Sequence, residues 1–419
     1  MKKQLVFLAA LLAISNLACS LVNRVIEGGP QPAGIPTIII EFPPTATTQP
    51  QATATELQPT YTPVQPSPTV AASATAEPAA QPSPTVPAPV QTMILVDADA
   101  QTPQFILVDP LTGQVKSKFT AKGASKYGYG YASETAVYYQ AADLVSGFWR
   151  VGLDGGVSQL KFKNPDDYLG STGFLPSPDG KRIAWGQIIT MDAGGRTHYT
   201  LKVANADGSD EKTLLDATDE IPFYRIPVGW SRDGQSLYYS GVPDGIGGYI
   251  LFGNGTDLVR VDLKTGQGQV ILSDRSTFRP FAVSPDEKTV VYLKRNTSLE
   301  AFFMDVATKE KRSFKLPEGA TQAGKFVWSP DSQAVVMTLA MGDPEKEEAF
   351  TVLKVDAASL SQEILLDKDA RLISAAAWPV KDLIWLTTYY DPTTWILAPA
   401  GKQLVEVQAQ GLLIPDGWR

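Results

Sequence analysis

Histidine and cysteine, which recur in catalytic and metal sites, are rare in this 419-residue chain. The chain contains one histidine, His198, and one cysteine, Cys19. A single histidine excludes metal sites built from several histidines, and no Gly-x-Ser-x-Gly sequence marks a serine nucleophile. A lone histidine beside an apolar stretch is usually a surface or hydrogen-bonded residue. We therefore assign no catalytic residue.

Acidic residues gather in one place where calcium binding has to be considered. Asp207, Asp210 and Glu211 supply three oxygen donors within a short segment. Calcium takes six to eight oxygen ligands, and this spacing lacks the rest of an EF-hand loop. The Asp207-Gly208 pair is also typical of a hairpin turn. We favour the turn and predict no metal and no cofactor, with these three carboxylates as the alternative calcium ligands.

Two groups of aromatic residues are candidate contacts for a ligand or partner: Tyr127, Tyr129 and Tyr131, and then Tyr389, Tyr390 and Trp395. The first three alternate with glycines, so on a strand they would share one face. Tyr and Trp suit binding surfaces because they bring a large contact area at a low cost in entropy. The interpretation that we favour is simpler, namely that these rings pack between neighbouring elements.

A seven-fold internal repeat indicates the elements that position these residues. Each copy is a short apolar strand, then a small or acidic residue and a turn, at intervals of roughly 50 residues. The seven copies end at Gly113, Gly156, Gly208, Gly266, Lys309, Ser359 and Gly401. Radial β-repeats look like this because a four-stranded blade cannot bury both faces without neighbours. The pattern predicts an all-β, seven-bladed propeller over residues 92–419, with six blades as the alternative.

A second marker, a turn resembling Ser-Pro-Asp-Gly, alternates with the first. Its clear copies are residues 177–180, 230–234, 284–287 and 328–332. Pro and Asp initiate tight turns, and Gly accepts a positive φ. The first blade lacks this turn, whereas Pro415-Asp416-Gly417 ends the chain. We predict that residues 412–414 form the inner strand of the blade that opens at Met93, which would close the ring.

The Trp-Ser-Pro-Asp-Gly-like turns, with strands that end in Val-Asp-x-x-Thr-Gly, resemble the TolB-type, WD40-like propeller repeat. Similar blades form the N-terminal propellers of prolyl-oligopeptidase and dipeptidyl-peptidase-IV-like proteins. The resemblance covers about Met93 to Arg419 and implies a platform that binds proteins on a rim or along its axis. The sequence has no counterpart of the peptidases' hydrolase domain, so the resemblance does not extend to their catalysis.

Residues 1–19 resemble a bacterial lipoprotein signal peptide. Lys2 and Lys3 precede an apolar stretch that is too short to span a bilayer, and Cys19 follows a small residue. The resemblance implies cleavage before Cys19 and acylation of this residue. Asn16 stands where such signals usually have leucine. An ordinary secretory signal, with Cys19 incidental, is the alternative.

Residues 20–91 are rich in Pro, Thr, Ala, Gln and Ser and carry almost no charge. This composition cannot bury enough apolar surface to offset chain entropy, and it favours extended polyproline II. We predict a disordered stalk between the signal peptide and the propeller. The net charge of −8 and the absence of a basic stripe argue against nucleic acid as a partner.

These features predict a monomeric, extracytoplasmic propeller, anchored by lipid on Cys19 to the cell membrane or the outer membrane. In this interpretation it binds a protein partner and catalyses no reaction. One alternative is a carbohydrate-active hydrolase or lyase, which would need convergent carboxylates with perturbed pKa values at the propeller mouth. Another is a module that binds glycans or small ligands through its tyrosines. Burial of Tyr127, Tyr129 and Tyr131 between blades would count against the second alternative.

Overall fold

The computed structural model describes residues 93–97, 104–120, 130–133, 135–140, 148–160, 170–191, 196–219, 223–243, 251–273, 277–342, 348–389, 391–400 and 402–414. The predicted signal peptide and stalk lie outside the described residues. The elements of the described part are all β-strands. Among these residues there is no helix that is long and apolar enough to cross a lipid bilayer.

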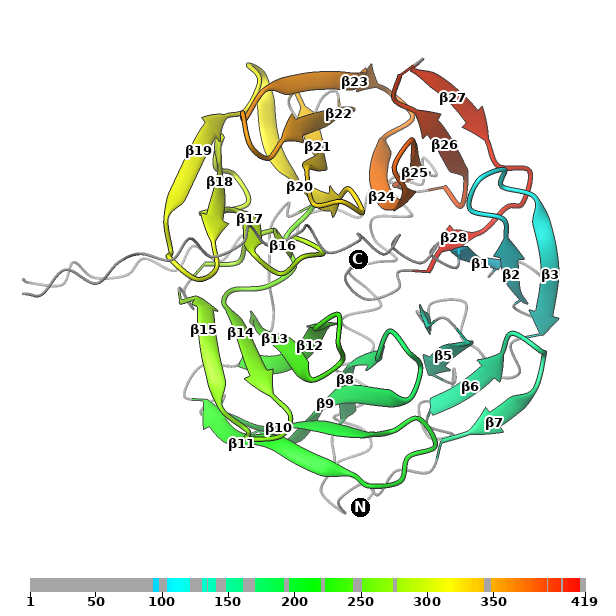
Figure 1. Ribbon diagram of the computed structural model, residues 1–419, viewed down its shortest axis with the longest axis vertical. Helices are drawn as coiled ribbons and strands as arrows, with labels where there is room; N and C mark the ends of the chain where they lie inside the picture. Colours follow the sequence, from blue (N-terminus) through cyan, green and yellow to red (C-terminus); the bar gives the residue numbers. More distant parts are fainter. Residues whose placement is uncertain are drawn as a thin grey trace, which may run out of the picture. The chain divides into compact units, whose positions relative to one another are not determined.

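Seven four-stranded antiparallel sheets, or blades, are arranged around a common centre (Figure 1). The prediction of seven blades is confirmed, and the six-blade alternative is wrong. The innermost strands, which we call the inner ring, are β28 (Leu412–Leu413), β4 (Gly130–Ala132), β8 (Gly170–Pro176), β12 (Phe223–Trp230), β16 (Phe281–Val283), β20 (Ala320–Trp328) and β24 (Ile373–Val380).

The other three strands of each blade follow outward in chain order. The second strands are β1 (Met93–Asp97), β5 (Ala136–Gln140), β9 (Arg182–Met191), β13 (Ser236–Pro243), β17 (Thr289–Leu293), β21 (Ala334–Met341) and β25 (Leu383–Thr388). The third are β2 (Gln104–Val108), β6 (Phe148–Gly152), β10 (Thr197–Asn205), β14 (Leu258–Asp262), β18 (Glu300–Asp305), β22 (Ala349–Asp356) and β26 (Thr394–Ala398). The outermost are β3 (Val115–Thr120), β7 (Val157–Gln159), β11 (Lys212–Asp219), β15 (Gly268–Leu272), β19 (Lys311–Lys315), β23 (Gln362–Asp369) and β27 (Gln403–Glu406).

The two sequence markers occupy fixed places in every blade where they occur. The first marker is the third strand and its turn toward the outermost strand, and the second is the turn between the innermost and second strands. The aromatic residue of the second marker ties blades together. The Trp230 indole N–H donates to the Leu175 carbonyl of the preceding blade, and Trp328 donates to Ala282 in the same way.

Among the described residues, one apolar cluster lies between each pair of neighbouring blades, and an eighth is formed by Phe252, Ala340 and Phe350. Strand β1 illustrates why a blade strand is apolar at almost every position. Ile94 and Val96 pack toward blade 2, while Met93 and Leu95 pack toward blade 7. Because alternate residues of a strand face opposite sides, a blade between two neighbours needs apolar residues at every position.

The ring closes as predicted. Strand β28 pairs antiparallel with β1, with Leu413 opposite Leu95, and so completes the first blade from the other end of the described chain (Figure 1). The Trp385 indole of blade 7 adds a hydrogen bond to the Pro110 carbonyl of blade 1. Residue Ile414 then packs into the cluster between blades 1 and 2.

Candidate functional site

The inner ring combines apolar surface with basic charge. Its strands carry two basic side chains, Arg225 on β12 and Lys325 on β20, and these described strands contain no Asp or Glu. Half-buried aliphatic side chains accompany them, among them Ile226, Val228 and Val283. Because Arg225 is buried, Lys325 is the one exposed charged side chain on these described strands, in a protein whose net charge is −8.

Lys325 lies at an irregularity of β20. The register with β21 shifts between Gly324 and Val327, so the residues between them bulge out of the ladder. Lys325 has a φ of 50° and is exposed to solvent. Protein atoms surround the side chain even though water still reaches it. They disfavour the charged form and so lower the pKa of the ammonium group.

A segment inserted between β13 and β14 reaches from blade 4 to the edge of the inner ring. We call residues 251–257 the crossing segment. Phe252 packs against Phe350 of blade 6 with ring centroids 5.3 Å apart. A Cβ atom on Gly324 would overlap Phe252, so glycine is needed here for the segment to lie directly on β20.

Polar contacts fix the crossing segment to blades 5 and 6. The Asn254 side chain pairs with the backbone of Phe281 in both directions, each at 2.9 Å. The Leu251 amide donates to Gln322 Oε1 on β20 at 3.0 Å, and Asn296 Nδ2 donates to the same oxygen at 2.7 Å. The crossing segment thus joins three consecutive blades on one side of the propeller.

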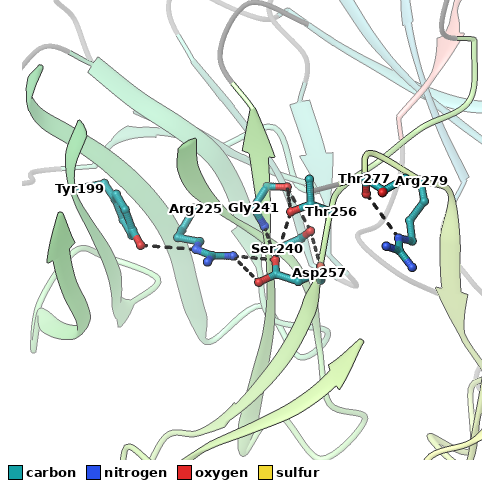
Figure 2. Close-up of polar contacts among 8 residues, drawn as sticks. All are labelled: Tyr199, Arg225, Ser240, Gly241, Thr256, Asp257, Thr277 and Arg279. Atoms are coloured by element: carbon teal, nitrogen blue, oxygen red, sulfur yellow. Dashed lines mark hydrogen bonds and ion pairs between the residues drawn. The ribbon is translucent and has the colours of Figure 1, made fainter. Parts of the chain in front are cut away.

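A buried ion pair holds the end of the crossing segment (Figure 2). Arg225 Nη1 lies 2.6 Å and 2.8 Å from the two carboxylate oxygens of Asp257, and both side chains are almost fully buried. Asp257 Oδ1 also accepts the Gly241 amide at 2.8 Å. Arg225 Nε reaches the Tyr199 hydroxyl at 3.5 Å. One carboxylate therefore binds the innermost strand and the second strand of blade 4 together.

Charge pairing outweighs burial at this ion pair. Burial opposes the positive charge of Arg225, but the hydrogen bond and the negative charge of Asp257 raise its pKa overall. Thr256 adds hydrogen bonds from its amide and its hydroxyl to the Gly241 carbonyl. A Cβ atom on Gly241 would come within 2.9 Å of both Arg225 and Thr256, so this glycine gives the cluster its space.

The aromatic candidates that the structure describes are packed rather than gathered on one surface. Tyr131 packs against the cluster shared by blades 3 and 4. Tyr389 stands edge-on to Phe350, with centroids 5.9 Å apart. Trp395 lies under the Arg371 guanidinium, 4.7 Å from the ring centroid. The remaining candidates lie outside the described residues, as does the lipidation candidate: Tyr127, Tyr129, Tyr390 and Cys19.

The three candidate calcium ligands point their carboxylates to separate partners. Asp207 accepts the amide and hydroxyl of Ser209, which lowers its pKa as expected for a turn aspartate. Asp210 pairs with Lys212 at 3.1 Å, and Glu211 pairs with Lys202 at 2.7 Å. In the part of the chain that the structure describes, no three His, Cys, Asp or Glu side chains come close enough together to hold a metal ion.

His198 and the crossing segment show what sequence reasoning found and what it missed. His198 Nε2 lies 2.7 Å from Asp216 Oδ1 on β11, an exposed hydrogen-bonded place of the kind expected for it. The Arg225–Asp257 pair and Lys325 were not singled out. A signal for Lys325 was available, because a lysine stands in an otherwise apolar stretch just before a Trp-Ser-Pro-Asp turn.

Comparison with known proteins finds likeness of fold. No protein-family model matches the chain, and the comparison with curated proteins gave no match. Among solved structures, a putative 6-phosphogluconolactonase from Bacteroides uniformis is 11% identical with a TM-score of 0.49, covering 78% of this chain and 97% of that one. TolB from Acinetobacter baumannii is 13% identical with a TM-score of 0.38, covering 77% and 80%.

The β-propeller domain of the trilobed protease from Pyrococcus furiosus is also similar. It is 12% identical with a TM-score of 0.40, and the match covers 57% of this chain and 71% of that one. The resemblance to TolB-type and peptidase-type propellers is thus found in structure as well as in sequence motifs. Likeness at this level concerns the architecture alone, which hosts many unrelated activities.

Proposed function

We propose that this protein is an extracytoplasmic propeller, anchored to a membrane through acylated Cys19, that binds another protein and catalyses no reaction. The crossing segment carries the proposal. It builds up one side of the propeller, and it is held there by a buried ion pair and by hydrogen bonds to three blades. A rigid loop on a rigid scaffold is a common form of recognition surface. We assign the docking face to this side.

The loop between β17 and β18 belongs to the same face. Its Asn296 shares Gln322 with the crossing segment, and Leu299 nearby is 54% exposed. An aliphatic side chain this exposed beside a structured loop suits the apolar centre of a protein interface. The inner ring favours binding over the carbohydrate-active alternative as well, because its exposed charge is a lysine rather than a pair of carboxylates.

The decisive experiment is affinity capture with the full-length protein from detergent-solubilised envelope of the native host. We expect one or a few proteins to be retained in stoichiometric amounts. Leu299→Glu should reduce their retention, since it places a charge on the docking face. Val270→Glu is the matched control, because Val270 is 53% exposed on the outermost strand β15, away from that face.

Two results would contradict this proposal. One is an eluate that stays empty at low salt while glycan arrays or hydrolase screens give a signal. The other is partner retention that Val270→Glu reduces as much as Leu299→Glu does.

Anchoring is tested separately with Cys19→Ala. Several acyl chains hold a protein on a bilayer far better than one, so the wild-type protein should partition into the detergent phase on Triton X-114 separation. The variant should move to the aqueous phase and lose incorporation of labelled palmitate. Unchanged partitioning of Cys19→Ala would favour the ordinary secretory signal instead.

A further inference from the structure

Lys325 lies next to residues that pack into the two interfaces flanking its blade. The next residue, Phe326, packs against the cluster shared by blades 5 and 6, and Val327 belongs to the cluster shared by blades 6 and 7. Lys325 itself is exposed on the innermost strand. The preceding residue, Gly324, contacts the crossing segment at Phe252. The lysine therefore borders the docking face assigned above.

Among the described residues, no counter-ion accompanies Lys325. Within the described part of the chain it makes no hydrogen bond and no ion pair, and burial is the sole cause acting on its pKa. The other basic group of the inner ring, Arg225, is neutralised by Asp257. An ammonium group that protein partly surrounds, and that has no counter-ion among the described residues, attracts an anion that can reach it.

The backbone at Lys325 departs from what its position favours. Gly173 in blade 3 and Lys325 in blade 6 both lie four residues before the serine of the second marker, with φ values of 55° and 50°. Glycine adopts this left-handed conformation freely, whereas lysine adopts it at an energetic cost. Residues kept in such conformations cluster at functional sites, so the outlier motivates a functional hypothesis.

Three other lysines of the described chain have a positive φ: Lys309, Lys368 and Lys402. The Lys368 amide donates to the Thr351 hydroxyl on the neighbouring strand, whereas the other two use their side chains. Lys309 donates its Nζ to the Val270 carbonyl at 3.3 Å, and Lys402 donates to the Ile364 carbonyl at 2.8 Å. Both thereby connect to the outermost strand of the preceding blade. The Lys325 side chain makes no such hydrogen bond among the described residues, and unlike Lys368 it stands on an innermost strand.

We propose that Lys325 is an anion-binding contact of the inner ring and that it binds a carboxylate of an acidic peptide segment of the partner. This inference rests on the proposed function and names the chemistry of the partner. A single ammonium group on an inner ring that also carries half-buried aliphatic side chains, Val228 and Val283 among them, matches one monovalent carboxylate flanked by apolar residues. Phosphate groups favour clustered donors, and nucleic acid favours a basic stripe.

The test uses full-length protein and fluorescein-labelled peptides, with binding followed by fluorescence anisotropy. The acidic probe is (Glu-Leu)4 with blocked ends, and (Gln-Leu)4 with blocked ends is the neutral control. A third peptide, (Gln-Leu)4 with a free C-terminus, distinguishes a chain-terminal carboxylate from side-chain carboxylates. We expect tighter binding of a carboxylate-bearing peptide than of the neutral control.

Variants then locate the contact. Lys325→Met should weaken binding of the acidic peptide about 10- to 100-fold, as expected for loss of a charged hydrogen bond. Lys325→Arg should stay within about threefold of wild type because it keeps the charge. Lys309→Met is the matched control, since it removes a lysine of the same backbone conformation outside the inner ring, and it should leave binding unchanged.

Lys325→Gly separates binding from folding. It removes the charge and the backbone strain together, so its melting temperature should equal or exceed that of the wild-type protein while acidic-peptide binding is lost. The proposal is overturned if Lys325→Met and Lys325→Gly bind like wild type, or if the neutral peptide binds as tightly as the carboxylate-bearing ones.

The two proposals fail in different ways. If a partner is captured from the envelope and the Lys325 variants retain it, the protein-binding function stands and the carboxylate contact does not. If no partner is captured while the acidic peptide binds in a Lys325-dependent manner, the anion contact stands and the scaffold function does not.

Discussion

One turn position shows how single residues connect neighbouring blades. Gly180 and Gly234 occupy the left-handed position of the second marker in blades 3 and 4, whereas Glu287 and Ser332 occupy it in blades 5 and 6. Each of the two non-glycine residues accepts a backbone amide from the preceding blade: Glu287 from Arg232 and Ser332 from Asp286. The energetic cost of a non-glycine residue at this left-handed position is thus offset by a hydrogen bond between blades.

Of the two residues, Glu287 connects the blades more strongly than Ser332 does. Its carboxylate also accepts the Tyr238 hydroxyl at 2.9 Å and pairs with Arg260 at 3.3 Å. Relief of a left-handed conformation is worth about 1–2 kcal/mol, and each hydrogen bond to a charged group about 1.5–3 kcal/mol. We expect Glu287→Gly to destabilise the protein by about 1–5 kcal/mol in urea unfolding, because two hydrogen bonds to the carboxylate are lost and one strained residue is relieved. A gain in stability would contradict this.

Asp109 predicts how stability responds to acid. A hydrogen bond from Lys116, with further bonds from backbone amides, lowers the pKa of Asp109 to about 2. An unfolded chain has a value near 3.9, so the folded state favours the charged form. The stability that this provides is present above about pH 4 and is lost as the pH falls toward 2. The melting temperature of Asp109→Asn should therefore fall less between pH 5 and 2.5 than that of wild type, and equal slopes would refute this.

At the scale of strands, what the sequence predicts depends on how local the signal is. The turns were predictable because Asp, Pro and Gly act within four residues, and the strands because burial on two faces requires unbroken apolar runs. The Arg225–Asp257 pair joins residues on different strands and depends on a crossing segment with no periodic signal. Lys325 lies in a β-bulge, which changes the side of the sheet that the following residues face. The alternation of residue types along the sequence does not reveal such a change.

The Arg225–Asp257 pair yields the prediction at this scale. Removing one partner of a buried ion pair leaves an uncompensated charge, so Arg225→Met and Asp257→Leu should each cost about 3–5 kcal/mol in urea unfolding. The double variant should cost clearly less than the sum of the two. Lys212→Met, which breaks the exposed pair with Asp210, should change stability by only about 0.5 kcal/mol. Additive costs would mean that the pair does not couple β12 to the crossing segment.

At the scale of the whole molecule, the ring of blades is closed by strand β28, whose two residues pair with β1. Strand β28 covers the inner edge of β1, and without it β1 would present unpaired backbone groups, which invite association between chains. A chain that ends after Gly411 should melt at a lower temperature and form oligomers on size-exclusion chromatography. A chain that ends after Ile414 is the control and should remain monomeric. Equal behaviour of the two would show that the ring holds without β28.

The same closure sets an order in time. During synthesis, chains fold from the N-terminal end as residues emerge at about 5–20 per second. Blades 2 to 7 hold their four strands in consecutive order, so each can be completed as soon as it is made. The first blade begins with β1 and remains three-stranded until β28, the last described strand, arrives. The earliest part of the propeller to be synthesised is consequently the last to be finished, and it stays open to chaperones and proteases for the whole of that interval.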